Sequence, residues 1–263
     1  MRNVKFSLVS CAVLTFSSAL FAADNEVSAT PSRPTVASGA SISEAGWVEI
    51  ELGMQRTRDT LSGAAENRDA LPYLAKYSFD KRWALWLGGD AAIRDEGAGS
   101  TMRGVGDTTV TLKHKFSIDN EKLSAGFEAA IKLPTADESK GLGSGEKDFG
   151  LKGIYGVDLP AGLHLDTNLG ATRYGLETAG VSRTGYLWAV ALSRPVSEKL
   201  TLAADLSGTR QTGVPSTRQL MLAGSYAISK RIVADAGMQW GLNDNSPDWT
   251  AFAGVTLLLG KIQ

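Results

Sequence analysis

From Trp47 onward, apolar and polar residues alternate with a period of two along nearly the whole chain. In the stretch 47–55, every second residue is apolar, namely Val48, Ile50, Leu52 and Met54. Successive side chains of a β-strand point to opposite faces, so this pattern predicts strands with one apolar and one polar face. No window contains the roughly 18 to 20 apolar residues that a membrane-spanning helix needs. If the chain enters a membrane, it therefore crosses it as strands.

Twelve stretches with this alternation follow one another, and most are close to the roughly 9 to 11 residues of a tilted membrane-crossing strand. They are 47–55, 71–79, 83–94, 107–116, 123–133, 149–159, 163–169, 186–192, 200–206, 219–228, 232–240 and 249–259. The last stretch is apolar on both faces near its end, which leaves its facing open. We expect an all-β fold, a transmembrane antiparallel up-and-down β-barrel of about twelve strands.

The predicted links between strands alternate between short and long. Short links fall at 80–82, 117–122, 160–162, 194–199 and 229–231, and longer ones at 58–69, 95–103, 134–147, 175–183, 210–217 and 241–248. Outer-membrane barrels have short periplasmic turns and longer outer loops, and an even strand count places both termini in the periplasm. A soluble β-sandwich also has alternating strands, but its loops need not alternate in length.

Aromatic residues on the apolar faces gather near both ends of the predicted strands. Phe79, Trp83, Phe116 and Tyr226 fall near the short links, and Phe149, Tyr186, Trp240 and Phe252 near the long ones. Two such bands are typical of the aromatic girdles at the two membrane interfaces. They favour the membrane barrel over the soluble sandwich.

The N-terminus is typical of an export signal. Arg2 and Lys5 precede a short apolar run that ends at the small residues Ala22 and Ala23. We expect a signal peptide over 1–22, with the cleavage position open, and hence passage into the periplasm of a Gram-negative bacterium. The single cysteine, Cys11, would leave with the signal and remove disulfide and thiol chemistry from the mature chain.

The stretch after the signal is small, polar and contains two prolines. It predicts a flexible periplasmic N-terminal arm over 23–45, followed by a barrel domain over 46–263. The arm could also enter the barrel as a plug, and the sequence does not decide between these positions.

Two stretches resemble a known family: GVGDTTVTLKHKF at 104–116, and KLPTADESKGLGSGEKDFGLKGIYGVDL at 132–159. They are similar to the outer-membrane family named after the meta-pathway of phenol degradation, whose members are often labelled transporters. The resemblance implies a barrel for small, often aromatic or hydrophobic compounds, and gives 135–148 extra weight as a loop that folds into the lumen. Many outer-membrane barrels end on an aromatic residue, whereas this chain ends at Gln263.

Catalytic, metal and nucleic-acid roles find little support in the residues. His114 and His164 are the only histidines, and they are separated, with no GxSxG or HExxH motif nearby. Acidic residues at 137, 138, 146 and 148 could bind a divalent cation, but a solvated outer loop explains them as well. No cluster of Lys and Arg interleaves with aromatics. We expect no enzyme, cofactor, metal site or nucleic-acid partner.

Charged residues on the predicted polar faces must point to water or to one another, because facing lipid is costly. As lumen-lining or substrate-contacting residues we predict Glu49, Glu51, Lys76, Asp90, Arg94, Lys113, Lys115, Glu128, Lys132, Lys152, Asp166, Asp205 and Asp235. These charges either line a wet pore or pair across the lumen and close it.

The sequence thus predicts a porin-like outer-membrane channel or transporter for passive or facilitated passage of small solutes. Its partners would be outer-membrane lipids, the solutes and, during biogenesis, the barrel assembly machinery. A closed structural or adhesive barrel and, more remotely, a barrel enzyme are the alternatives.

Overall fold

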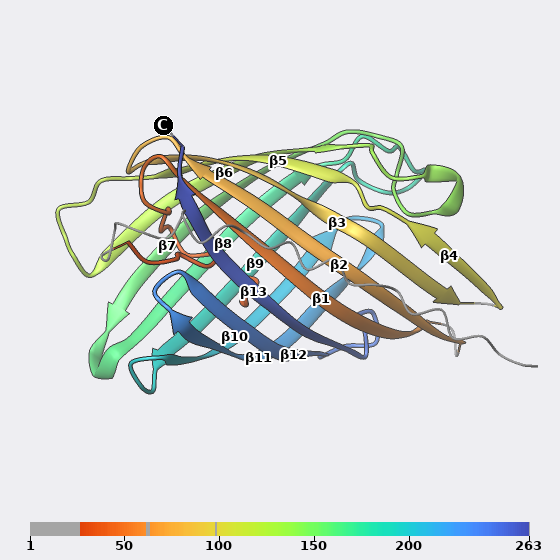
Figure 1. Ribbon diagram of the computed structural model, residues 1–263. Coiled ribbons are helices and arrows are strands. Elements are labelled where there is room, and N and C mark those ends of the chain that lie inside the picture. The colour runs from red at the N-terminus through yellow and green to blue at the C-terminus, as the bar shows by residue number, and fades with distance from the viewer. Residues whose placement is uncertain (1–26, 62–63, 98, 263) are drawn as a thin grey trace, which may run out of the picture.

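In the computed structural model, antiparallel strands form one closed barrel (Figure 1). The structure describes residues 27–61, 64–97 and 99–262, so the predicted signal peptide lies outside the described residues. The strands are β1 (Trp47–Leu61), β2 (Ala64–Ser78), β3 (Trp83–Gly97), β4 (Ser100–Gly104), β5 (Thr108–Lys115), β6 (Leu123–Leu133), β7 (Asp148–Leu159), β8 (Leu163–Arg173), β9 (Thr184–Pro195), β10 (Leu200–Gln211), β11 (Val214–Ser229), β12 (Ile232–Gly241) and β13 (Trp249–Lys261). Two 3₁₀ turns, η2 (Glu138–Lys140) and η3 (Pro160–Gly162), lie in the links.

The barrel closes because β1 pairs with both β2 and β13. β4 and β5 share one position in the wall: β4 pairs with the segment 93–97 of β3, and β5 with the segment 83–88. The predicted twelve-stranded antiparallel barrel is confirmed, with the fourth strand interrupted at 105–107. Among the described residues, no helix is long and apolar enough to span a membrane.

Three predicted long links are largely strand. β1 ends at Leu61 and β2 begins at Ala64, β3 ends at Gly97 and β4 begins at Ser100, and β10 and β11 are joined at 212–213. Opposite charges on neighbouring strands stabilise the first extension, since Arg56 and Asp69 are direct partners and form an ion pair of 2.8 Å. The links 134–147, 174–183 and 242–248 do form longer loops. We call the end of the barrel that carries these three loops the long-loop end.

The outer wall is apolar and the inner wall is polar, as the period-two pattern predicts. Exposed apolar residues such as Met54, Leu151 and Leu169 lie on the outer face, whereas Glu49, Lys76 and Lys113 are buried inside. His114 lies outside, near the short turns, where its ring packs between Trp83 and Phe127. Its position fits an interfacial residue and separates it from the lumen.

Residues 27–45 lie inside the barrel, at the end that carries the short turns (Figure 1, left). They form no helix or strand, yet Ala37 and Ala40 are almost fully buried. The sequence predicts a flexible periplasmic arm and leaves open whether it enters the barrel as a plug; the structure places the described part of the arm in the lumen. Small residues make this position possible, because a chain with large side chains would not fit between the inner walls.

Candidate functional site

The candidate site is the short-turn half of the lumen, where wall charges surround the arm. Seven of the predicted lumen residues are less than 10% exposed: Glu49, Glu51, Lys76, Lys113, Glu128, Asp205 and Asp235. They come from β1, β2, β5, β6, β10 and β12. Strand alternation places each of them on the inner face, and the barrel's closure then brings strands from opposite ends of the chain around one space.

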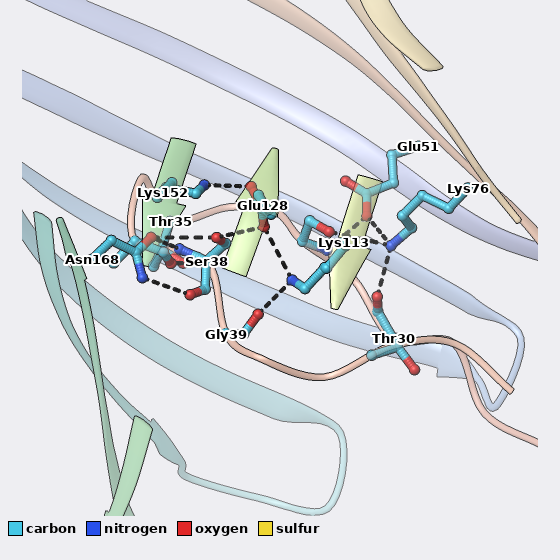
Figure 2. Close-up of polar contacts among 12 residues, drawn as sticks. Thr30, Thr35, Ser38, Gly39, Glu51, Lys76, Lys113, Glu128, Lys152 and Asn168 are labelled. Carbon is cyan, nitrogen blue, oxygen red and sulfur yellow. Dashed lines mark hydrogen bonds and ion pairs between the residues drawn. The ribbon is translucent and has the colours of Figure 1, made fainter. Parts of the chain in front are cut away.

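Lys76 lies at the centre of the first cluster. Its Nζ contacts Glu51 Oε1 at 2.6 Å and also forms an ion pair with Glu49, its direct partner across the β1–β2 ladder. The arm completes the cluster, because the backbone N–H of Thr30 donates to Glu49 and that of Ser32 donates to Glu51. Lys76 in turn donates to the carbonyl oxygen of Thr30 at 2.7 Å (Figure 2). Two buried carboxylates are thus balanced by one ammonium and two backbone donors.

Glu128 organises the second cluster. Its two carboxylate oxygens accept from Lys113 at 3.2 Å and from Lys152 at 2.7 Å (Figure 2). The hydroxyl of Ser38 donates to Glu128, and Lys113 donates to the carbonyl oxygen of Gly39 at 2.6 Å. The same Lys113 ammonium lies 4.4 Å from the centre of the Trp86 ring, a cation–π distance. Both clusters therefore include hydrogen bonds to main-chain atoms of the arm.

Three further wall residues hold the arm from the other side of the barrel. Asn168 binds the main chain of Ser38 twice, accepting from its N–H at 2.8 Å and donating to its carbonyl at 2.9 Å. Asp205 accepts from the N–H of Ala37 at 2.8 Å. Asp235 forms an ion pair of 3.0 Å with Arg33 of the arm.

These contacts explain why so many charges are tolerated inside. A buried ion that loses its partner is strongly destabilising, so each charge needs a counter-charge or a hydrogen-bond donor. The arm supplies several of those partners through its backbone. We therefore regard the wall charges and the arm as one polar unit that occupies the short-turn half of the lumen.

Arg94 does not face the lumen, which corrects the sequence prediction. Between the pairs Ala70–Ile93 and Pro72–Asp90, β3 has one residue more than β2. Such a β-bulge inverts the facing of every residue beyond it. Asp90 therefore keeps its lumen position, where it pairs with Arg68, while Arg94 lies on the outer face beside Asp69.

The remaining predicted residues lie toward the two mouths. Lys132 contacts Asp107 at 2.9 Å and Asp148 at 3.0 Å near the long-loop end. Lys115 shares the inner face of β5 near the short turns. Asp166 lies there too, 3.2 Å from His164, whose other ring nitrogen lies 2.5 Å from Asp158. In the described ranges, no group of three or more His, Cys, Asp or Glu residues could hold a metal ion.

The loop 134–147 covers part of the opposite mouth. Leu142 is buried against Ala70 and Ile93, which lie on the inner face, with Ala136 packed beside them. Lys132 ties the loop to the wall by donating to Ser144 at 2.6 Å. At the loop's tip, hydrogen bonding from Ser139 and the nearby Lys140 lower the pKa of Asp137. The lumen is thus narrowed at both ends by segments of the same chain.

Several lumen residues escaped the sequence prediction. Asn168 and Trp86 lie on inner faces whose parity was readable, but a search for charges alone passes over them. Phe252 was assigned to an outer girdle, yet its ring lies 5.6 Å from the Arg33 guanidinium in the lumen. The register Gln55–Phe252 settles the facing of β13, which the sequence left open.

A family model described as the MetA-pathway of phenol degradation matches residues 32–259. Among solved structures, an outer membrane channel from Pseudomonas putida F1 is 15% identical, with a TM-score of 0.66 over 90% of this chain and 99% of that one. The KdgM porin is 11% identical (TM-score 0.53, 80% and 98% covered), and the translocator domain of the autotransporter NalP from Neisseria meningitidis is 12% identical (TM-score 0.52, 81% and 88% covered). No curated protein matches the sequence.

Proposed function

The chain belongs to the family described as the MetA-pathway of phenol degradation, and on that basis we propose that it is an outer-membrane channel for small solutes. The solved structures with a similar fold include an outer membrane channel and a porin, which supports both the location and the transport role. The polar inner wall with an apolar outer wall is the physical feature that a membrane channel requires. Outer-membrane lipids and the barrel assembly machinery are the partners that this location entails.

The observation that carries the proposal is the arm inside the lumen. It is held mainly through its backbone by wall side chains, so it forms a removable constriction rather than part of the wall. In this conformation the short-turn half is closed to large hydrated solutes. Solute passage then requires the arm to shift, which makes the protein a gated channel.

We further propose that hydrophobic or aromatic compounds are preferred. The family's description links it to phenol degradation, and the arm closes the wide polar path that a general porin would offer. A labelled aromatic acid should therefore enter cells carrying the protein faster than cells lacking it, while uptake of a sugar of similar mass should change little. Equal uptake of both would indicate an unselective pore.

The conductance of the refolded protein in a planar lipid bilayer tests the gate. We expect small steps for the wild type and severalfold larger steps for the double variant Arg33→Ala/Asn168→Ala, which removes arm contacts on two sides. Gln239→Ala is the matched control, because Gln239 lies on the inner wall near the long loops and contacts Gln219 rather than the arm. Silence of both proteins, together with no uptake, would favour the closed structural barrel.

A further inference from the structure

The outer wall of β1–β4 carries a transverse row of charged residues. Arg56 is the register partner of Asp69, Asp69 that of Arg94, and Arg94 that of Arg103. Register partners share a face, and this face also carries Leu52 and Met54, which are 46% and 63% exposed. The row therefore points away from the lumen, toward the surroundings of the barrel. A second row beyond it contains Arg58 and Glu96.

The two rows carry more positive than negative charge. Arg56 and Arg94 share the Asp69 carboxylate, at 2.8 and 3.9 Å, and Arg94 also pairs with Glu96. Within the part of the chain that the structure describes, Arg58 and Arg103 form no ion pair, and both are exposed. Two guanidinium groups thus stand free on a face with four arginines and two carboxylates.

The height of these rows on the barrel makes them unusual. Arg58 is the register partner of Trp249, which in turn pairs with Trp240 on the neighbouring strand. Outward tryptophans mark the level of the membrane interface, so Arg58 lies at that level. Arg56 lies two residues farther toward the middle of the barrel. A charge facing hydrocarbon there is costly, whereas a charge beside lipid phosphates is stabilised.

An apolar hollow lies directly below the arginines. A cavity of about 740 Å³ is bordered by Arg56, Arg94 and Arg103 and by apolar residues that include Met54, Leu71 and Ala253. The hollow forms because small residues such as Ala253, Ala92 and Ala251 line it, and their side chains do not fill the space between the larger ones around them. A cationic rim above an apolar floor fits an amphiphile with an anionic head and an acyl chain.

We propose that this surface binds lipopolysaccharide of the outer leaflet, with separate lipid phosphates on Arg58 and on Arg103 and an acyl chain in the hollow. The inference rests on the proposed outer-membrane location. Guanidinium groups bind phosphate through paired, charge-assisted hydrogen bonds. Arg58 and Arg103 are exposed and form no ion pair within the described residues, so they can bind phosphate without giving up a protein partner. Arg173, Arg210 and Arg218 also lie on the outer face near the long loops, but none has another arginine as a register partner.

Native mass spectrometry of the full-length protein, purified in detergent and incubated with bisphosphorylated lipid A, tests the site. For Arg58→Gln/Arg103→Gln we expect a loss of bound lipid A of at least about tenfold, because each of the two charged contacts removed accounts for roughly a factor of ten or more. Neither side chain forms an ion pair within the described residues, so the barrel should fold normally. Arg218→Gln is the matched control and should bind like the wild type. Unchanged binding by the double variant would overturn the proposal.

Two further probes identify the part of the ligand that is bound. Dephosphorylated lipid A should bind about as weakly to the wild type as phosphorylated lipid A binds to the double variant. If phosphatidylglycerol binds as well as lipid A, the site is a general phospholipid contact and the assignment to lipopolysaccharide is wrong. Heat-dependent migration on a denaturing gel is measured on the same samples. A chain that never shows a folded band contradicts the barrel and its location, whereas a folded barrel with unaltered lipid binding contradicts the lipid site alone.

Discussion

The lumen near the short turns and the outer wall near the long loops both carry many charged residues, but the charges are buried in the first region and exposed in the second. Inside, Lys76, Glu49 and Glu51 are almost fully buried and every partner is a fixed protein group. Outside, Arg56 and Asp69 pair while half exposed, and Arg103 has no ion pair among the described residues. We therefore expect burial, rather than the number of charges, to decide which ion pairs contribute to the stability of the barrel.

Removing Lys76 should have the largest effect. In Lys76→Met, Glu49 and Glu51 remain buried without their cation, and breaking a buried ion pair costs about 3 to 5 kcal/mol. We expect a loss of that size in the free energy of unfolding, measured by urea titration of the barrel in detergent micelles. Lys140→Met, which removes an exposed pair with Asp137, is the control and should change little. Equal losses of unfolding free energy in the two variants would contradict the expected difference between buried and exposed ion pairs.

Removing Arg33 should loosen the arm while the wall stays intact. Arg33→Ala leaves Asp235 without its partner and frees the neighbouring part of the arm. Amide hydrogen exchange at Thr30 and Ser32, whose N–H groups donate to wall carboxylates, should accelerate by about tenfold, as a loss of about 1.4 kcal/mol predicts. The amides of Ala37 and Ser38, held by Asp205 and Asn168, should respond less. Unchanged exchange at Thr30 would show that Arg33 does not anchor the arm.

Removing an outer pair should have a small effect. Exposed ion pairs contribute about 0.2 to 1 kcal/mol, so Arg56→Ala should lower the free energy of unfolding by no more than that. The measurement is the same urea titration as for Lys76→Met. A loss as large as the loss in Lys76→Met would mean that this outer row is structural, and would weaken its assignment as a ligand surface.

Lowering the pH should have the smallest effect of these changes, and the effect should be confined to the loop 134–147. The pKa of Asp137 is lowered below its usual 3.8 by Ser139 and Lys140, so its ionised form is favoured in the folded loop. The resulting stabilisation is present above pH 3.8 and disappears as the pH falls through the lower folded pKa. Carboxyl NMR titration should give a pKa below 3.8, and Ser139→Ala should move it back toward 3.8. An identical titration in both chains would contradict the Ser139 contact.

Strand periodicity was sufficient to predict the barrel and most of its inner face. Alternation survives in sequence because lipid excludes charge from one face, so residues such as Glu128 and Asp205 could be assigned inward. Arg94 could not, because a single extra residue in β3 inverts the parity without leaving a local sign. The extended ends of β1 and β2 were also missed, since their charged residues look like loop residues until the cross-strand pairs are known.

The position of the arm could not be predicted from the residues of the arm itself. Its small polar residues are typical of a mobile segment, and nothing within 27–45 is apolar enough to predict burial. The burial of the arm could be inferred only indirectly, because the many charged residues of the inner wall require partners. Asn168 and Asp205 bind main-chain atoms of the arm, and no side-chain pattern in the arm itself encodes these contacts.

The position of the arm limits the order in which the barrel can assemble. The groups that hold it come from β1, β2, β5, β6, β8, β10 and β12, and no partial sheet presents all of them around one space. Although the arm precedes every strand in the chain, all of its contacts form together only when the sheet has curved far enough to bring β1, β8 and β12 around one space. The segment that precedes all the strands in the chain is therefore held by contacts that become complete only as the barrel itself is completed.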